Sequence, residues 1–248
     1  MTFGKSLFNT NAQLLITTVI SFAYLVNSFG LTMARVLLRQ LSTAARDWVL
    51  PAAHTRAIVV YPHKVLTTTS ASIAVPCSLD VLQLLSDLIK TCRENDGLGL
   101  AAPQVGASLR AFVMRRPSPL RPSRMWRRAA AAPAVGDFWV CVNPRVTALS
   151  GPGITGVESC LSVPDASFLV RRQRDIAVEF LDASGAPVSL RLEGLPAVIF
   201  QHELDHLDGV LVPDRELRAF EHTSHSQEQH RAEVLWETDV REYYQALL

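Results

Sequence analysis

Apolar and polar positions change their spacing several times between residues 51 and 215. Over 79–92, leucine, valine and isoleucine recur every three or four positions, which predicts an amphipathic helix. The polar residues and the glycine at 95–97 predict the end of that helix. Short runs rich in β-branched and other apolar side chains predict strands at 57–61, 111–114 and 140–142.

A hairpin and a second helix complete the pattern. Residues 174–181 and 188–192 are strand-like and are separated by a turn signal at 182–185, so they predict a β-hairpin. Apolar spacing at 195–207 predicts a second helix. This mixture of short strands and helices favours an α+β fold, and the length of 51–215 suits one domain with a single core.

The second predicted helix carries the pattern His202-Glu203-Leu204-Asp205-His206. Residues four apart lie on one face of a helix, so both histidines can bind one metal ion. Glu203, one position along, can act on a water that such a metal binds. Catalytic metal sites usually have three protein ligands and an open position, so the chain has to supply a third ligand.

Two kinds of third ligand remain open. Metzincin proteases have a third histidine at the position that Val212 occupies, which disfavours that class. A downstream glutamate would indicate a gluzincin-like metallopeptidase, and the candidates are Glu221, Glu228, Glu233 and Glu237. Cys160, in the segment 158–162 (ESCLS), would instead complete a Cys/His/His site.

Three segments together resemble the peptide deformylase family. They are 97–104 (GLGLAAPQ), 158–162 (ESCLS) and 201–209 (QHELDHLDG), in the order in which the family has them. The resemblance implies the family's fold, in which small antiparallel sheets pack around a central helix that bears the HExxH motif. It also implies the activity, which is removal of the N-formyl group from the N-terminal formylmethionine of nascent polypeptides with release of formate.

The resemblance assigns roles to residues of these segments. Cys160, His202 and His206 would hold one divalent metal ion, with Fe(II) as the natural metal and Zn(II), Ni(II) or Co(II) able to occupy the same site. Glu203 would take a proton from the attacking water and return it to the departing amine.

Three further residues would act on the substrate. The Gln104 side-chain amide and the Leu161 backbone N–H would donate hydrogen bonds to the carbonyl oxygen as negative charge builds on it. Gly99 would let the backbone approach the substrate closely, because glycine has no Cβ.

Two positions depart from the family pattern, which has glycine at both. Ser159 would be strained if its backbone needed positive φ, whereas Asp165 tolerates the left-handed region and adds a negative charge near the substrate groove. We expect the chemistry to survive and substrate fit or rate to change. If these side chains block the groove, the alternative is a weak or inactive deformylase-like protein that binds nascent chains or the ribosome.

Residues 1–50 have the composition of a targeting extension. The first 46 positions contain four basic residues and no acidic one. Residues 33–48 combine arginines and hydroxyl residues with helical apolar spacing, which is typical of a mitochondrial presequence, so we expect the protein in the mitochondrial matrix. Met33 is an alternative start codon to Met1. The apolar run 14–26 is shorter than the roughly 20 residues of a membrane span, so we expect no membrane anchor.

Two other segments lie outside the catalytic pattern. The insertion 115–137 contains six arginines and several prolines, and it predicts either a solvated basic loop or a contact with mitochondrial ribosomal RNA. The charged tail 216–248 predicts a helix packed on its own domain. The net charge of +1 predicts no general attraction to DNA. The four cysteines have no paired spacing, which indicates a reducing compartment rather than disulfides.

Overall fold

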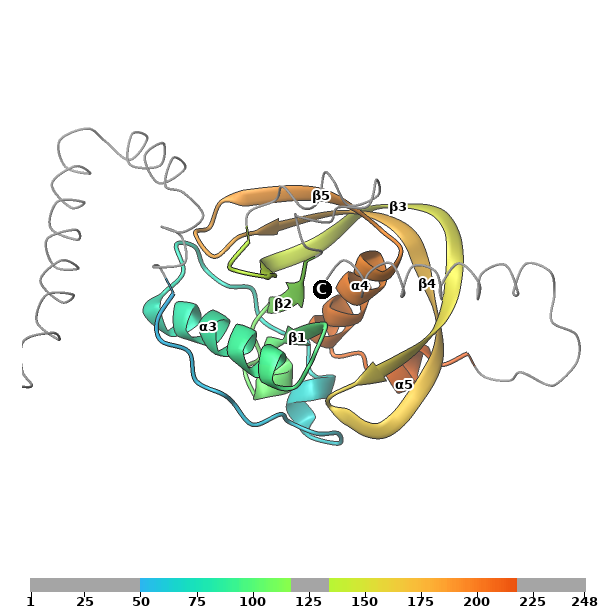
Figure 1. Ribbon diagram of the computed structural model, residues 1–248, viewed down its shortest axis with the longest axis horizontal. Coiled ribbons are helices and arrows are strands. Elements are labelled where there is room, and N and C mark those ends of the chain that lie inside the picture. The colour runs from blue at the N-terminus through green and yellow to red at the C-terminus, as the bar shows by residue number, and fades with distance from the viewer. Residues whose placement is uncertain (1–49, 117–133, 218–248) are drawn as a thin grey trace, which may run out of the picture. The chain divides into compact units, whose positions relative to one another are not determined.

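One five-stranded antiparallel sheet, flanked by two longer helices, organises the residues that the computed structural model describes, 50–116 and 134–217. In chain order the elements are η2 (Lys64–Thr67), α3 (Leu79–Glu94), β1 (Gly99–Ala101), η3 (Ala102–Val105), β2 (Ala111–Arg115), β3 (Phe138–Cys160), β4 (Val163–Leu181), β5 (Pro187–Glu193), α4 (Leu195–Asp208) and α5 (Val212–Arg215). The predicted α+β fold is confirmed. The several small sheets expected from the resemblance are one sheet, because every strand pairs with the next along the chain (Figure 1).

The predicted helix over 79–92 and the predicted hairpin are both present. Helix α3 begins after Ser78, whose hydroxyl accepts a hydrogen bond from the Val81 N–H, and ends at Glu94. Strands β4 and β5 pair as the hairpin. The strand predicted at 140–142 is only the first part of β3, because most of the polar residues that follow pair with β4.

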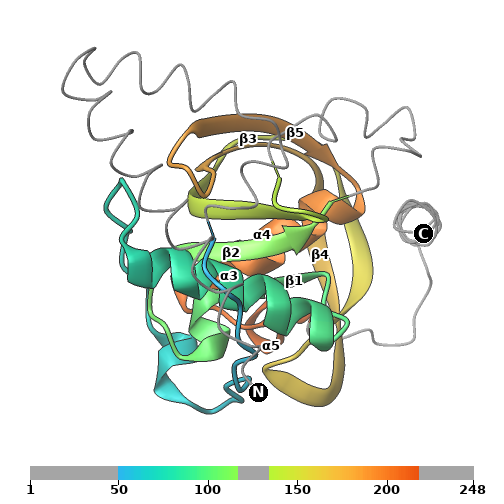
Figure 2. The same cartoon turned by 60° about the vertical axis from the view of Figure 1, so that its left-hand side comes forward.

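The first part of the sheet is buried on both faces. Along β2 and the start of β3, neighbouring side chains alternate between two cores. Phe112, Met114, Trp139 and Cys141 pack with residues of α4, and Ala111, Val113, Phe138, Val140 and Val142 pack with residues of α3. Strands β1 and β2 therefore lie between the two helices (Figures 1 and 2). Burial on both faces explains why 111–114 is an uninterrupted apolar run.

Strands β3 and β4 are long and curve strongly (Figure 1). Their register shifts at four places, and Gly151, with φ of 74°, lies in the shift between Ser150 and Gly153. Such irregularities bend a strand pair and increase its twist. The pairing ends at Cys160 and Val163, so the turn between the strands lies in the ESCLS segment.

Residues 51–61 form an extended segment, here called the N-terminal strap, that first bonds to α3. The Ser86 hydroxyl donates to the Pro51 carbonyl at 2.6 Å, and the His54 N–H donates to the Asp87 carboxylate at 2.8 Å. Both partners on α3 are buried side chains. The strap thus satisfies polar groups on the helix that would otherwise be buried without partners.

The strap then reaches two loops. The Val59 N–H donates to the Gln104 carbonyl at 2.8 Å, and the Tyr61 N–H donates to the Ser162 carbonyl at 2.9 Å. The prediction of a strand at 57–61 is therefore wrong. Its N–H groups bond to η3 and to the β3–β4 turn instead of to a neighbouring strand.

Helix α4, predicted at 195–207, packs against the sheet. The Phe200 ring meets the Phe112 ring of β2 edge-on, with centroids 5.0 Å apart. The helix ends at Gly209, which has φ of 74°. A Cβ at Gly209 would lie 2.8 Å from the carbonyl carbon of Thr67, so the chain can pass η2 here only without a side chain.

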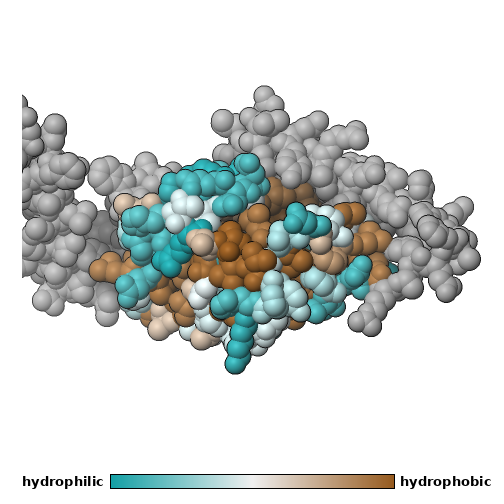
Figure 3. All heavy atoms as spheres, turned by 90° about the horizontal axis from the view of Figure 1, so that it is seen from below, coloured by the Kyte–Doolittle hydropathy of each residue, from teal (hydrophilic) through white to brown (hydrophobic). Residues whose placement is uncertain are grey.

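The surface of the described residues mixes polar and apolar side chains. Figure 3 shows one face on which apolar atoms gather in the middle and polar atoms border them. Apolar atoms contribute more than half of an ordinary protein surface, so this face by itself indicates no ligand. Within 50–116 and 134–217, no helix is long and apolar enough to cross a membrane.

Several sequence predictions fall partly or wholly outside the described residues. They concern the targeting extension before residue 50, most of the basic insertion (117–133) and the tail from 218 onward. All four cysteines are described, and each is a free thiol, as predicted.

The Asp87 carboxylate anchors the strap to α3. It is 2% exposed and accepts hydrogen bonds from the Gln83 amide at 2.7 Å and the Arg56 guanidinium at 2.8 Å, besides the His54 N–H. Burial raises the pKa of Asp87, but these hydrogen bonds outweigh it, so the pKa lies below its ordinary value.

We expect Asp87→Ala to lower the free energy of unfolding by about 2 kcal/mol at pH 7, because a buried charged acceptor is lost. A group whose folded pKa is depressed stabilises the fold above its ordinary pKa, and this contribution disappears as the pH falls through the folded pKa. The difference between wild type and variant should therefore shrink below about pH 4. Urea denaturation at pH 7 and pH 3 measures both effects.

Asp80→Ala is the control, because Asp80 is an exposed carboxylate on the first turn of the same helix. It should change the free energy of unfolding by less than about 1 kcal/mol. Two results would contradict the anchoring role of Asp87. One is an equal loss of unfolding free energy in the two variants, and the other is a difference between wild type and Asp87→Ala that is larger at pH 3 than at pH 7.

Candidate metal centre

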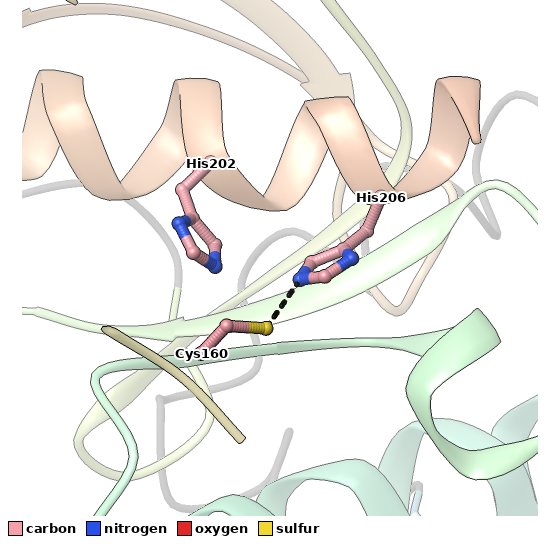
Figure 4. A group of neighbouring side chains, drawn as sticks. All are labelled: Cys160, His202 and His206. Carbon is pink, nitrogen blue, oxygen red and sulfur yellow. Dashed lines mark hydrogen bonds between the residues drawn. The ribbon is translucent and has the colours of Figure 1, made fainter. Parts of the chain in front are cut away.

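Three side chains with metal-ligand chemistry meet where β3 ends. Cys160 is the last residue of β3, and His202 and His206 lie on successive turns of α4. One donor atom from each lies within 4.8 Å of the others, and Cys160 Sγ lies 3.3 Å from His206 Nε2 (Figure 4). The structure thus brings together the three predicted ligands, and a thiolate with two imidazoles suits several first-row divalent cations.

Glu158 fixes the orientation of His202. Its carboxylate accepts hydrogen bonds from His202 Nδ1 at 2.8 Å and from Arg172 Nε and Nη2 at 2.8 and 2.9 Å. Burial raises the pKa of Glu158, but these hydrogen bonds lower it to about 2, so the carboxylate is charged and can only accept. His202 Nδ1 therefore carries a proton, and Nε2, which points toward Cys160 in Figure 4, is the atom available to a metal.

The two histidines differ in their affinity for protons. Burial lowers the pKa of His206 well below its ordinary value, and the charge of His202 adds to this effect. Burial also lowers the pKa of His202, but hydrogen bonds with Cys160 and Glu158 raise it overall to about 10. A cation that binds both imidazoles must therefore displace a proton from His202, whereas His206 is already in the neutral form that ligates.

Arg172 connects the sheet to α4. Besides its two bonds to Glu158 of β3, it donates to the carboxylate of Asp205, which lies between the two histidines in sequence. Arg215 of α5 also donates to Asp205, at 2.8 Å. The buried charges of Arg172, Glu158 and Asp205 are therefore paired, as burial requires. These ion pairs fix α4 relative to β3, the strand that carries Cys160.

Glu203 lies beside the three ligands and is 3% exposed. Burial raises its pKa to about 7, with the charge of His202 opposing the shift in part. Among the described residues, its Oε2 atom has no hydrogen-bond partner. A carboxylate with this pKa can both accept and return a proton near neutral pH.

Gly99 leaves the space that the Glu203 carboxylate fills. A Cβ at Gly99 would lie 2.3 Å from Glu203 Oε1, closer than any contact that real Cβ atoms make. The sequence analysis expected Gly99 to let backbone approach a substrate. The structure adds a different reason for the glycine, which is contact with the buried acid.

Gln104, on η3, is 2% exposed. Its Oε1 accepts a hydrogen bond from the Ala101 N–H at 2.8 Å, and its Nε2 lies 3.6 Å from Cys160 Sγ and 3.3 Å from Ser162 Oγ. The predicted amide donor thus lies in direct contact with the ligand cluster.

A cavity of about 440 Å³ opens onto this cluster. Gln104, Cys160, Leu161, His202 and Glu203 all line it, and so does Gly99. Apolar side chains form another part of the wall, namely Leu98, Val157, Leu195, Val198 and Ile199. The site therefore joins polar, titratable groups to an apolar chamber, which is the usual composition of a small-ligand site.

The two departures from the family pattern have different outcomes. Ser159 lines the cavity but is not among the described residues with positive φ; it pairs with Ser167, whose hydroxyl lies 2.9 Å from its own. Ser159 therefore does not have the backbone strain that a positive φ would have caused. Asp165 has φ of 59°, so it occupies the left-handed region that aspartate was expected to tolerate.

Sequence reasoning assigned no role to four residues that shape the site: Glu158, Ser162, Arg172 and Asp205. Glu158 and Ser162 lie inside the ESCLS segment, two positions on either side of Cys160. The role of Glu158 could have been suspected from the sequence, because an acidic residue lies only two positions from a candidate cysteine ligand. Nothing in the sequence spacing pairs Arg172 with Asp205, because the packing of α4 against β4 that brings them together is a tertiary feature.

Comparison with known proteins places the chain in one family. The sequence profile described as Polypeptide deformylase matches residues 55–221. The chain is 34% identical to the peptide deformylase of Desulfosudis oleivorans over 182 residues, covering 73% of this chain and 96% of that protein. It is 38% identical to the peptide deformylase of Aquifex aeolicus over 160 residues, covering 64% of this chain and 86% of that protein.

Solved structures agree with the sequence matches. A class I type b peptide deformylase from Acinetobacter baumannii, with Met-Ala-Ser bound, superposes with a TM-score of 0.56 at 32% identity and covers 65% of this chain and 98% of its own. Peptide deformylase from Thermotoga maritima superposes with a TM-score of 0.55 at 31% identity, covering 66% of this chain and 99% of its own.

We expect Gly99→Ala to lower turnover at least about 100-fold, because the new Cβ displaces the Glu203 carboxylate that would move the proton. The three atoms nearest to the new Cβ all belong to Glu203 and none to a candidate ligand, so the metal content of the purified protein should stay at the wild-type level. Steady-state kinetics and elemental analysis of the same preparations measure the two effects.

Gly97→Ala, two positions earlier in the chain, provides the contrast. A Cβ at Gly97 would meet Cys92 Sγ at 3.0 Å and not Glu203, so this variant should lose thermal stability more than turnover. Equal loss of turnover in both variants would show that displacement of Glu203 is not the cause.

Proposed function

The chain belongs to the polypeptide deformylase family, and we propose that it removes the formyl group from N-terminal formylmethionine of polypeptides made in an organelle. The reaction is the hydrolysis of a linear amide and releases formate and a free N-terminal amine. The observation that carries this proposal is the convergence of Cys160, His202 and His206 beside the buried acid Glu203.

Cys160, His202 and His206 would hold the metal. When bound at such a site, a divalent cation lowers the pKa of its water to about 7 and polarises a carbonyl group. The donor set fits, because the three atoms are close together, His206 is neutral and Glu158 leaves Nε2 of His202 available. We propose Fe(II) as the native metal, with Zn(II), Ni(II) or Co(II) able to replace it, since mixed sulfur and nitrogen ligands accept all four.

Glu203 would carry the proton. Its unpartnered Oε2 atom and its pKa of about 7 suit acceptance of a proton from the attacking water. The same carboxyl group then returns the proton to the amine nitrogen as the C–N bond breaks, so the acid ends the cycle in its starting state. Gly99 keeps the carboxylate in place for both steps.

Gln104 and Leu161 would stabilise charge on the formyl oxygen. Both residues line the cavity next to Cys160, one through a side-chain amide and the other through its backbone N–H. Loss of one such donor commonly costs about 2.7–4 kcal/mol of barrier, so the Gln104 amide would contribute as much as a general base does.

The apolar part of the cavity suits the methionine side chain. Leu195, Val198 and Ile199 of α4 line this part of the wall. A relative with a bound Met-Ala-Ser peptide supports a peptide of this kind as the ligand. Formyl-Met-Ala-Ser is therefore the substrate of choice for a test.

We also propose that residues 1–50 direct the protein to mitochondria, on the basis of their basic, acid-poor composition. A fusion of 1–50 to a fluorescent protein should co-localise with a mitochondrial marker. The same fusion with Arg35, Arg39 and Arg46 replaced by glutamate should remain in the cytosol, because the presequence charge is reversed. Equal distributions of the two fusions would reject the proposal.

The central test is formate release from formyl-Met-Ala-Ser by the full chain, purified without oxygen and loaded with Fe(II). Wild type should release formate, and Glu203→Ala should lower the rate at least about 100-fold while keeping the metal. Cys160→Ala should lose both the metal and the activity.

Each contrary outcome has a distinct meaning. A metal-loaded wild type that binds the peptide without releasing formate would support a non-catalytic binding protein. Formate release that survives Cys160→Ala would show that the metal has another third ligand. A parallel assay with an unformylated peptide would detect cleavage of the peptide chain itself, which only a metallopeptidase would produce.

A further inference from the structure

Ser162 lies at the junction of three segments around the site. It follows Cys160 and Leu161 in the β3–β4 turn and is 0% exposed. Its hydroxyl oxygen lies 3.3 Å from Gln104 Nε2, and its carbonyl accepts the Tyr61 N–H of the strap at 2.9 Å. Ser162 is therefore tied to both η3 and the N-terminal strap.

The orientation of the Gln104 amide follows from its partners. The Ala101 N–H can only donate, so the side-chain atom 2.8 Å from it has to be the oxygen of Gln104. The two N–H groups of Nε2 therefore lie on the side of Ser162 and Cys160. One N–H donates to the Ser162 hydroxyl, which leaves the second for the ligand cluster.

Gln104 is consequently held at three points. The strap fixes its backbone through the Val59 N–H, Ala101 fixes Oε1, and Ser162 fixes Nε2. Nε2 also lies 3.6 Å from Cys160 Sγ, which is only a weak acceptor. Without the Ser162 contact, the side chain would keep the hydrogen bond between Oε1 and the Ala101 N–H and this weak contact, and the direction of its second N–H would be less fixed. Donors contribute most to catalysis when they are already aimed at the developing charge.

We propose that Ser162 is a positioning residue for the Gln104 amide, a role that rests on the proposed deformylase function. Ser162 does not line the cavity, so it acts through Gln104 and not on the substrate. Its hydroxyl sets the direction of the remaining Gln104 N–H toward the place of the formyl oxygen.

A double-mutant cycle tests this role. Ser162→Ala should lower kcat about 10-fold, less than the loss of a whole donor, and change KM less than about twofold. In a Gln104→Ala background, the same Ser162→Ala change should alter kcat less than about twofold, because the group it positions is gone. A purely structural effect would instead multiply with the Gln104→Ala effect.

Ser86→Ala is the matched control, because Ser86 is a buried serine of α3 whose hydroxyl donates to the Pro51 carbonyl of the strap. It should lower thermal stability and leave kcat at the wild-type value. If Ser162→Ala does not fold, Ser162→Cys keeps the volume and weakens the acceptor, and it should show a smaller loss of kcat in the same direction.

NMR relaxation of the Gln104 side-chain NH2 group gives a readout independent of turnover. The group should be ordered in wild type and in Ser86→Ala and should become mobile in Ser162→Ala. If wild type releases no formate, the proposed function fails, and this measurement alone decides whether Ser162 holds the amide. An unchanged order of the NH2 group, or an undiminished Ser162→Ala effect in the Gln104→Ala background, would overturn the proposal.

Discussion

The buried carboxylate of Glu158 is the contact on which the rest of the site depends. It is ionised in the interior because Arg172 and His202 both donate to it, and it could not remain so without them. Removing one partner from such a group commonly costs about 3–5 kcal/mol, whereas the intact group contributes little net stability. The benefit is geometric, since one carboxylate joins β3, β4 and α4 and thereby sets the direction of a metal ligand.

The same site shows how far sequence reasoning extends. The HExxH spacing places His202 and His206 on one face of α4 because a helix repeats every 3.6 residues, and this local geometry needs no tertiary information. Cys160 was one of two kinds of third ligand that the sequence left open, and only the resemblance favoured it over a downstream glutamate, since nothing local links it to residues about forty positions later. The structure brings the donor atoms of Cys160, His202 and His206 together.

The limits of prediction have physical causes. Residues 57–61 have the composition of a strand, but their N–H groups find partners in two turns, and hydrogen-bond partners decide what a segment becomes. The length of β3 was underestimated because residues 143–160 contain many polar residues, three glycines and two prolines, yet pairing with β4 holds them extended. Gly99 was assigned to substrate approach, and only the packing of side chains shows that its missing Cβ makes room for Glu203.

The N-terminal strap limits where the proposed targeting extension could be removed. Residues 51–61 supply backbone hydrogen bonds to Gln104 and Ser162, so they support the site although they border the proposed targeting extension. A processing protease that cuts upstream of Pro51 leaves this support whole. A cut after Tyr61 would produce a chain that still contains the three candidate ligands and Glu203, yet lacks the backbone donors that hold the Gln104 and Ser162 carbonyls.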